Sequence, residues 1–362
     1  MPNQLVRQLI RLVNKELKSV ITKSINTKED CMRTFKATTF FGVVIATLII
    51  AGNTNAVDIG GPAPITSTLT IFEDSRLISD VTCSVANGPC ISLGAPNITL
   101  RLNGFTLTGP AESASLTNCA TSFAAGQDGI SAVQQNRVSI IGPGKVQKFS
   151  RHGISLFGNI TQSTGTEITV SRVTINQNCY SGIFMGGVSN SDIIDNVSVR
   201  NSNASEFRPC GGNCITNSNN NRILRNVFNG NGSVYGTAGN NDFGAGLVGT
   251  STGNLLQENA IGGNTQGIFI DTGAVGNIIR RNIIAGNPPI QVSTLFDLPL
   301  PIGSVGFDIR NLSPAGANVF DNNLCITYSG ASNTSNPAPC QDVPNLGGHR
   351  NSTVRILDRQ LQ

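Results

Sequence analysis

Asp271, Asp308 and Arg310 lie in the C-terminal third of the chain and carry groups that could act on an acidic sugar. A lyase or an epimerase needs a base, often Arg, Lys or His, and a group that neutralises the uronate carboxylate, often Ca²⁺ bound by Asp or Glu. We therefore take these three residues as candidate catalytic residues. Ca²⁺ would need more oxygen ligands than Asp271 and Asp308 supply, so the sequence establishes no metal or cofactor.

Two further groups of side chains could bind an anionic or a sugar ligand. The densest basic cluster consists of Lys145, Lys148, Arg151 and His152. It could contact an anionic polymer or be an ordinary solvated corner. Three phenylalanines are expected on one outward face and could lie under sugar rings; they are Phe157, Phe184 and Phe269. The alternative is a solvated face with a few exposed rings.

A short repeat must position these residues: an Asn recurs every fifth residue, with an apolar residue two places after it. The clearest copies begin at Asn221, Asn254 and Asn277. Looser copies begin at Asn136, Thr166, Ser191 and Asn318. Five residues do not suit a helix, which would distribute the Asn residues around its circumference. They fit a strand of three or four residues and a tight corner, stacked on copies of itself.

Polarity alternates within the predicted strands. The inward residues are all apolar: Val138, Ile168, Ile193, Ile223, Leu256, Ile279 and Phe320. Four of the seven preceding outward residues are charged; the seven are Arg137, Glu167, Asp192, Arg222, Leu255, Ile278 and Val319. Another strand starts with Gly-Ile or a close relative, at Gly129, Gly153, Gly182, Gly246, Gly267 and Gly306. Three strands and three corners per coil, each strand paired with its copy about 4.8 Å away, predict an all-β, right-handed parallel β-helix.

The strand that begins with Gly-Ile is where we expect a ligand-binding face. Its predicted outward rows are Ser131, Ser155, Phe184, Val248, Phe269 and Asp308, and then Val133, Phe157, Gly186, Thr250, Asp271 and Arg310. Insertions at 202–211, 232–245 and 288–305 all leave from the corner before this strand, and they contain Glu206, Arg208, Asp242 and Asp297. Such insertions form a groove or are tolerated surface loops, and the sequence leaves both open.

Two ladders of polar residues are expected to hold the coils in register. Stacked Asn side chains can satisfy the backbone groups of the corners and one another. Opposite charges also alternate at equivalent places in four copies, which are Asp195, Arg225, Glu258 and Arg281. Each such pair supports its neighbour by about 0.2–0.5 kcal/mol, which indicates coil registration rather than catalysis.

The first 56 residues differ from the rest of the chain. Residues 37–51 are the only long apolar run, and they are shorter than the roughly 20 residues of a membrane-spanning helix. Arg33 and Lys36 precede this run and small residues around Ala56 follow it, as in a secretory signal peptide. We assign residues 32–56 to a signal peptide that begins at Met32. Residues 1–31 are then a misassigned start or a dispensable leader.

Removal of the leader changes the charge of the chain. The whole chain has a formal net charge of +4. Without the eight basic and three acidic residues of 1–56, it keeps 17 basic and 18 acidic residues, a net charge of −1. A nucleic-acid partner therefore loses its electrostatic support. We expect a secreted, periplasmic or extracellular monomer with no membrane span after cleavage.

Eight cysteines follow residue 56, and an even number in an exported chain predicts disulfides. Cys83–Cys90 and Cys325–Cys340 fit local loop staples near the two ends. Cys119–Cys179 and Cys210–Cys214 would complete the set, although the sequence does not fix the connectivity. A metal site is a poor alternative, because neither of the two histidines lies near a pair of cysteines.

The start of the predicted solenoid resembles the opening coils of the exported right-handed parallel β-helix repeat family, whose fold is that of pectate lyases. The resemblance lies in residues 77–84 and in Leu100-Arg-Leu-Asn-Gly-Phe-Thr-Leu-Thr-Gly109, beside the family's Leu-Asp-Leu-Asn-Gly-His-Thr-Ile-x-Gly. Arg101 stands in place of the usual Asp, and Phe105 in place of the usual His. The resemblance covers residues 70–330 and implies the fold, but no enzyme subfamily is matched.

The fold is compatible with two functions. One is an exported module that binds a polysaccharide or acts at an extracellular surface. The other is a carbohydrate-active enzyme, a lyase or epimerase of acidic glycans, and convergence of Asp271, Asp308 and Arg310 in a pocket would favour it. Polygalacturonase-like enzymes of this fold carry Asp-Asp and Gly-His-Gly elements, which this sequence lacks. We expect residues 57–110 to form a capping region and first coil, 111–330 the β-helix, and 331–362 a tail.

Overall fold

The computed structural model describes residues 56–111, 119, 126–201, 211–232, 243–287, 307–330 and 339–340. The chain divides into two units, Met1–Asn55 and Ala56–Gln362, and every described residue belongs to the second. The predicted leader, the signal peptide and most of the tail therefore lie outside the described residues. Within the described residues the only helix is a single 3₁₀ turn, η1 (Ile160–Gln162), and none is long and apolar enough to cross a bilayer.

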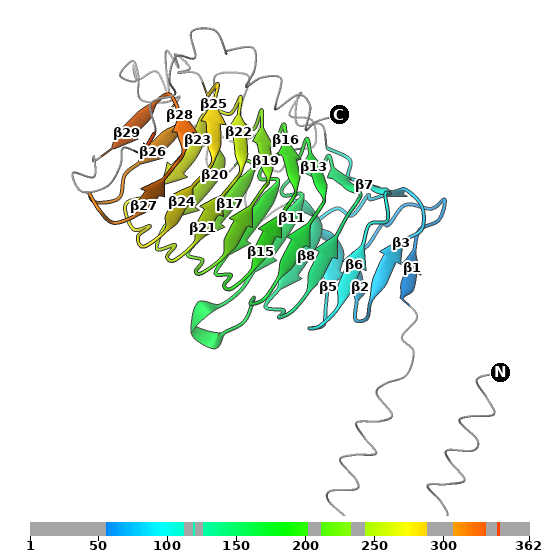
Figure 1. Ribbon diagram of the computed structural model, residues 1–362. Helices are drawn as coiled ribbons and strands as arrows, with labels where there is room; N and C mark the ends of the chain where they lie inside the picture. The colour runs from blue at the N-terminus through cyan, green and yellow to red at the C-terminus, as the bar shows by residue number, and fades with distance from the viewer. Residues whose placement is uncertain are drawn as a thin grey trace, which may run out of the picture. The chain divides into compact units, whose positions relative to one another are not determined.

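The described strands stack in three parallel sheets, and each complete coil contributes one strand to every sheet (Figure 1). The first sheet contains β1 (Val57–Ile59), β3 (Ser75–Leu77), β6 (Thr99–Arg101), β9 (Ser139–Ile141), β12 (Thr169–Ser171), β15 (Asp192–Ile194), β18 (Arg222–Leu224), β21 (Leu255–Gln257), β24 (Ile278–Arg280) and β27 (Val319–Asp321). The second contains β4 (Val81–Thr82), β7 (Thr106–Thr108), β10 (Lys145–Gln147), β13 (Thr174–Asn176), β16 (Val197–Val199), β19 (Val227–Asn229), β22 (Ala260–Gly262), β25 (Ile283–Ala285) and β28 (Leu324–Cys325). The third contains β2 (Leu69–Ile71), β5 (Gly88–Leu93), β8 (Gln127–Val133), β11 (Ile154–Phe157), β14 (Ile183–Gly186), β17 (Asn213–Thr216), β20 (Phe243–Val248), β23 (Gln266–Ile270), β26 (Ile309–Asn311) and β29 (Tyr328–Gly330).

Each strand pairs in parallel with its copy in the next coil, as β12 with β15 and β13 with β16. The chain is a right-handed parallel β-helix with three strands per coil, as the sequence predicts. Stacking begins early, because β1 already pairs with β3. The segment 57–110 therefore holds the complete coil β3–β4–β5 and strands of the coils on either side.

At the corners between the strands, residues with a left-handed backbone turn the chain. Each such residue ends a strand, so the strands are short. At the corner before the first sheet the φ angles are 51° at Asn190, 56° at Asn220, 65° at Gly253 and 69° at Gly276. Asn and Gly tolerate this region, so these two residue types recur there. At the next corner the chain instead uses charged residues, for example Arg225 with a φ of 53°.

Three Asn ladders run through the corners and hold the coils in register. They consist of Asn221, Asn254, Asn277 and Asn318; of Asn196, Asn226, Asn259, Asn282 and Asn323; and of Asn178, Asn201, Asn231, Asn264 and Asn287. In each rung the Asn backbone N–H and the side-chain amide donate to the Oδ1 of the next Asn, as from Asn196 to Asn226 at 2.9 and 3.0 Å. The amide also donates to a backbone carbonyl, here Val170 at 2.9 Å. The predicted structural role of these buried amides is confirmed.

The ladder also corrects the register predicted for two early coils. Strand pairing aligns Ile193 with Val170, and Val170 with Ile140. Val138 and Ile168 are buried, as predicted, but they occupy the Asn-ladder position rather than the position of Ile193. The five-residue pattern fails there because apolar residues replace the ladder Asn in these coils.

The predicted charge ladder is present at one corner. Arg225 pairs with Asp195 at 2.8 Å, and Arg281 pairs with Glu258 at 3.6 Å. A further exposed pair joins Arg222 to Asp192 at 2.5 Å between neighbouring strands of the first sheet. These side chains are largely solvated, so each pair contributes at most about 1 kcal/mol.

Disulfides staple the solenoid at the predicted places. Cys83–Cys90, Cys119–Cys179 and Cys325–Cys340 are bonded. Cys214 is also disulfide-bonded, while its predicted partner Cys210 lies outside the described residues.

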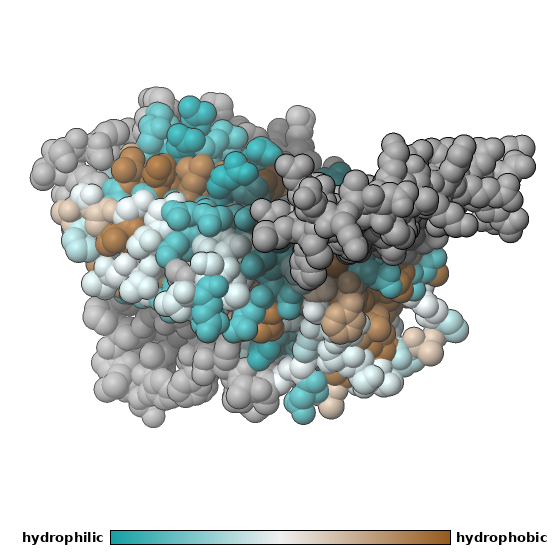
Figure 2. Space-filling view, turned by 90° about the horizontal axis from the view of Figure 1, so that it is seen from below, coloured by the Kyte–Doolittle hydropathy of each residue, from teal (hydrophilic) through white to brown (hydrophobic). Residues whose placement is uncertain are grey.

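The outer surface is partly hydrophobic toward the C-terminal coils. Ile278 and Val319 are neighbours in adjacent strands of the first sheet, and they are 39% and 44% exposed. Figure 2 shows hydrophobic side chains gathered in a row on the face seen from below, toward the side on which Figure 1 places the last coils. This contrasts with the charged outward residues Asp192 and Arg222 of the preceding coils.

Candidate functional site

The outer face of the third sheet carries most of the predicted site residues, in two outward rows. Strand pairing gives the first outward row as Ser131, Ser155, Phe184, Cys214, Gly246, Phe269 and Arg310. The second outward row is Val133, Phe157, Gly186, Thr216 and Val248, followed by Asp271 directly after β23. The predicted rows therefore change at several places. Val248 and Arg310 exchange rows, Gly246 and Cys214 enter the first row, and Thr216 enters the second. Thr250 leaves the second row, and Asp308 leaves the face.

The middle of the first outward row belongs to a second apolar core outside the coil. Phe184, Cys214, Phe243 and Phe269 form this cluster and are at most 9% exposed. The Phe243 ring occupies the space that a side chain at Gly246 would need, and it stacks on Phe269 with ring centroids 5.3 Å apart. Phe184 and Phe269 are thus packing residues, contrary to the prediction that all three phenylalanines could lie under sugar rings. The sequence pattern misses Phe243 because it places this residue in the insertion 232–245, whereas Phe243 is the first residue of β20.

The second outward row is accessible along its length. Val133 is 50% exposed, and Phe157, Gly186, Thr216, Val248 and Asp271 are half-buried. Phe157 and Phe184 have ring centroids 5.1 Å apart, and both rings approach the Cα of Gly186, where a larger residue would collide with Phe184. Phe157 is the one predicted aromatic residue whose ring remains available to a ligand among the described residues.

Asp128, at the start of the third-sheet strand β8, organises the predicted basic cluster. This carboxylate is 1% exposed and accepts hydrogen bonds from Arg151 Nε at 2.7 Å, from Arg151 Nη2 and from Ser155 Oγ at 2.8 Å. Burial alone would raise the pKa of Asp128, but its hydrogen bond with Arg151 and the nearby positive charges hold that pKa below its usual value. In the same way Asp128 raises the pKa of Arg151 despite burial.

The remaining members of this cluster do not form a basic patch with Arg151. His152 is 2% exposed, its Nδ1 accepts the backbone N–H of Ser181 at 3.3 Å, and its ring stacks on Phe184 at 4.8 Å. Lys145 lies in β10 of the second sheet, and Lys148 occupies a left-handed corner with a φ of 60°. The only sequence signal for the buried Asp128 is its place immediately before Gly129-Ile130, within β8.

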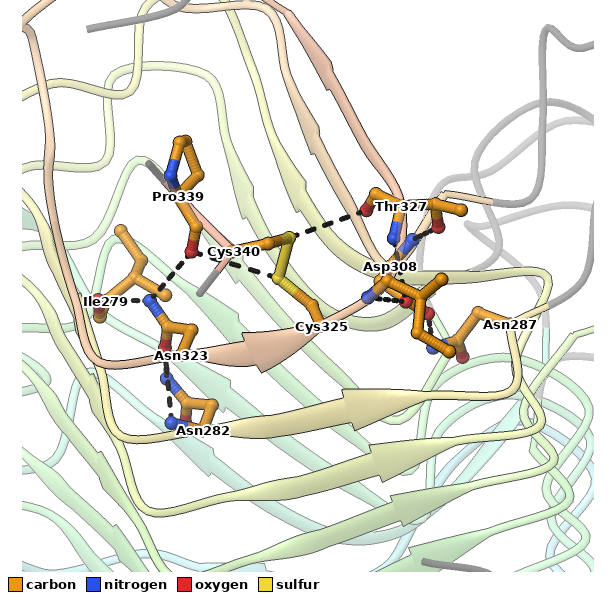
Figure 3. The surroundings of a disulfide bond; sticks show 10 residues. Ile279, Asn282, Asn287, Asp308, Asn323, Cys325, Thr327, Pro339 and Cys340 are labelled. Carbon is orange, nitrogen blue, oxygen red and sulfur yellow. Dashed lines mark hydrogen bonds between the residues drawn. A yellow bond between two sulfur atoms is a disulfide. The ribbon is translucent and has the colours of Figure 1, made fainter. Parts of the chain in front are cut away.

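Asp308 has a structural position at the end of the third Asn ladder (Figure 3). It occupies the place of Gly267 in the next coil, because the backbone of Ile268 pairs with Asp308 and Ile309. Its buried carboxylate accepts hydrogen bonds from Asn287 Nδ2 at 2.9 Å and from the backbone N–H groups of Ile326 and Thr327 at 2.8 and 3.1 Å. The Cys325–Cys340 disulfide lies beside it.

The three candidate catalytic residues are not brought together. Asp271 accepts the backbone N–H groups of Gly249 and Thr272 at 3.0 and 2.8 Å. Arg310 lies on the first outward row, with its guanidinium carbon 6.0 Å from the Phe269 ring centroid. Asp308 is turned into the corner of the coil, so the convergence that would favour a lyase is not observed for these residues.

The insertions leave from a single corner, as predicted. The strand order places 202–210, 233–242 and 288–306 between a second-sheet strand and the following third-sheet strand. The connection from β7 to β8 is a fourth long one that the repeat pattern missed. Glu206, Arg208, Asp242 and Asp297 lie outside the described residues.

The described residues also form a cavity away from the predicted site residues. A cavity of about 400 Å³ at the N-terminal end is lined by residues including Ile59, Leu69 and Phe72, and by none of the predicted site residues. Within the part of the chain that the structure describes, no group of three or more His, Cys, Asp or Glu is placed to hold a metal ion.

Comparisons with known proteins give similarity to solved structures only. No family model and no curated protein matches the chain. Tailspike protein 2 of the Escherichia coli O157:H7 bacteriophage CBA120 has a TM-score of 0.48 and 12% identity, over 76% of this chain and 40% of that one. Pectate lyase Pel9A has a TM-score of 0.40 and 13% identity, over 82% of this chain and 76% of that one. The chain spans less than half the length of the tailspike protein, and its fold is defined by its own strand pairing.

Proposed function

We propose that the protein is an exported β-helix that binds a polysaccharide along the second outward row of the third sheet. The observation that carries the proposal is the continuity of this row, which is accessible in six successive coils from Val133 to Asp271. Coils repeat about every 4.8 Å, so a linear polymer along the stacking direction would meet one side chain per coil.

The chemistry of the row supports binding of sugars. The half-buried Phe157 ring offers an apolar surface for the C–H face of a sugar ring. Thr216 and Asp271 add hydrogen-bonding groups further along the row. The long connections at 202–210, 233–242 and 288–306 precede strands of this sheet in the chain, and solenoids commonly place binding loops at such insertions.

Binding without bond cleavage is the activity that we propose. Asp271 and Asp308 both accept backbone N–H groups at corners of the coil, which favours structural roles for these two side chains. The disulfides support export to an oxidising compartment.

The test is retardation of the full, disulfide-intact chain in gels that contain pectin, alginate or a glycosaminoglycan. For a polymer that retards the wild-type chain, Phe157→Ala should weaken binding about tenfold, because burial of an aromatic ring contributes roughly 1.5–3 kcal/mol. Ile278→Ala is the matched control, since it removes an exposed apolar side chain from the first sheet. Equal retardation of Phe157→Ala and wild type would refute the proposed site, and growth of unsaturated-uronate absorbance would identify a lyase instead.

A further inference from the structure

Arg310 differs from the other arginines that the structure describes. It lies in β26 between Phe269 of the preceding coil and Ser329 of the following one. Its side chain is half-buried, and its guanidinium lies over the Phe269 ring at 6.0 Å. Within the described part of the chain, no carboxylate lies within salt-bridge distance of it.

Several arginines that pair with a carboxylate have a pKa shift opposite to that of Arg310. Arg76, Arg151, Arg222 and Arg225 each contact a carboxylate, and the pKa of each guanidinium is raised. The pKa of Arg310 is lowered, and burial is the only cause. A positive charge that is partly removed from water without a counter-charge is destabilised relative to solvent, and a bound anion would offset this effect.

We propose that Arg310, on the first outward row beside the C-terminal end of the second outward row, is an anion-binding site that takes one carboxylate or sulfate group. The proposal rests on the polysaccharide binding proposed above and specifies the ligand as an acidic polymer. The planar guanidinium can donate two parallel N–H···O hydrogen bonds to such a group. Phe269 covers one face of the guanidinium and so directs the ligand to its edge. Asp271, directly after the neighbouring strand β23, accepts two backbone N–H groups and makes no salt bridge with Arg310.

The site can be tested with one polymer in two charge states. Polygalacturonate and its fully methyl-esterified form share a backbone and differ in carboxylate charge. We expect the full, disulfide-intact chain to bind the acidic form at least tenfold more tightly than the esterified form. The reason is that hydrogen bonds between a guanidinium and a carboxylate are stronger than those to a neutral ester. Arg310→Met should remove this preference and leave binding of the esterified form unchanged, and Arg310→Lys should keep part of it. Arg101→Met is the control, since Arg101 is an exposed arginine on the first sheet.

The outcomes separate the two proposals. If Arg310→Met keeps the wild-type preference for the acidic polymer, or if Arg101→Met loses it equally, the anion site is wrong while polysaccharide binding can stand. If neither polymer binds the wild-type chain, the polysaccharide proposal fails for this backbone. The anion site is then tested with sodium sulfate alone, which should raise the melting temperature of the wild type but not of Arg310→Met, relative to sodium chloride at equal ionic strength. An equal rise in both would overturn it.

Discussion

Two partly buried arginines lie at strands β11 and β26 of the same sheet and have opposite surroundings. Arg151 lies at the corner before β11 and is bound by the buried carboxylate of Asp128. Arg310 lies in β26 against an aromatic ring and has no such partner among the described residues. Both charges are shielded from water, but only the first is neutralised within the described fold. The difference separates a charge that holds two coils together from one that is available to a ligand.

The comparison also explains why a basic cluster in a sequence is weak evidence for a binding site. Arg151 was grouped with Lys145, Lys148 and His152, whereas its charge is matched by an acid 23 residues away. Arg310 has no basic neighbour in sequence. Its availability depends on which side chains the coil register places around it, and not on local charge density.

The largest expected effect comes from removal of the carboxylate at the paired site. Asp128→Ala removes the carboxylate that accepts hydrogen bonds from the Arg151 guanidinium, the Ser155 hydroxyl and the backbone N–H of His152. The free energy of unfolding should fall by about 3–5 kcal/mol, measured by urea denaturation with the disulfides intact. Asp192→Ala breaks the exposed pair with Arg222 and should cost less than about 1 kcal/mol. Similar losses in both variants would contradict the distinction between buried and exposed pairs.

The stability that Asp128 contributes should decrease at low pH. The folded-state pKa of Asp128 is lowered below its usual value, so its stabilising contribution is fully present above the unfolded-state pKa of about 3.9. It is lost as the pH falls through the still lower folded-state value. The gap in unfolding free energy between wild type and Asp128→Ala should therefore be constant near neutrality and should narrow only below about pH 4. Narrowing at pH 6 would exclude Asp128 as its cause.

A buried polar group inside the coil also has no partner, and its removal should raise the free energy of unfolding. Asn213 is fully buried in the inward row between Ile183 and Ala245, and neither its Nδ2 nor its Oδ1 has a hydrogen-bond partner. Asn213→Val should stabilise the fold by about 1–2 kcal/mol, since an unsatisfied buried amide is removed. The control is Asn226→Val in a fully bonded ladder, which should destabilise. Loss of stability in Asn213→Val would indicate that a partner, such as an internal water, satisfies this amide.

The smallest expected effect concerns the unpaired arginine itself. Arg310→Met removes a partly desolvated charge and keeps most of the apolar stem, so unfolding free energy should stay constant or rise by up to about 1 kcal/mol. Arg222→Met, at an exposed salt bridge, should instead lose up to about 1 kcal/mol. Thermal melting compares the two directly. A clear loss of stability in Arg310→Met would show that Arg310 is structural and would weaken its assignment as a ligand site.

The sequence predicts the coil because its ladder residues are local and regular. Asn254, Asn259 and Asn264 mark the three corners of one coil within eleven residues. Prediction of the site is less complete, because a side chain's row depends on how many residues each corner absorbs. The sequence pattern aligns Gly306 with Gly267 and so predicts an outward Asp308, whereas Asp308 itself holds the place of Gly267. Phe157 and Arg310 were named from the sequence, while Asp128 required knowledge of the coil above it.

The third Asn ladder gives the solenoid a chemical direction along its axis. Every amide from Asn178 to Asn264 donates toward the C-terminal coil and accepts from the N-terminal one. The aligned amide dipoles therefore point the same way, with their positive end toward the last coil, as peptide dipoles do in an α-helix. Asp308 closes this column with a group that only accepts, and it has no side-chain N–H to offer to a further rung. An acceptor therefore lies at the positive end of the column, at the place of Gly267 in its coil rather than at a further ladder position.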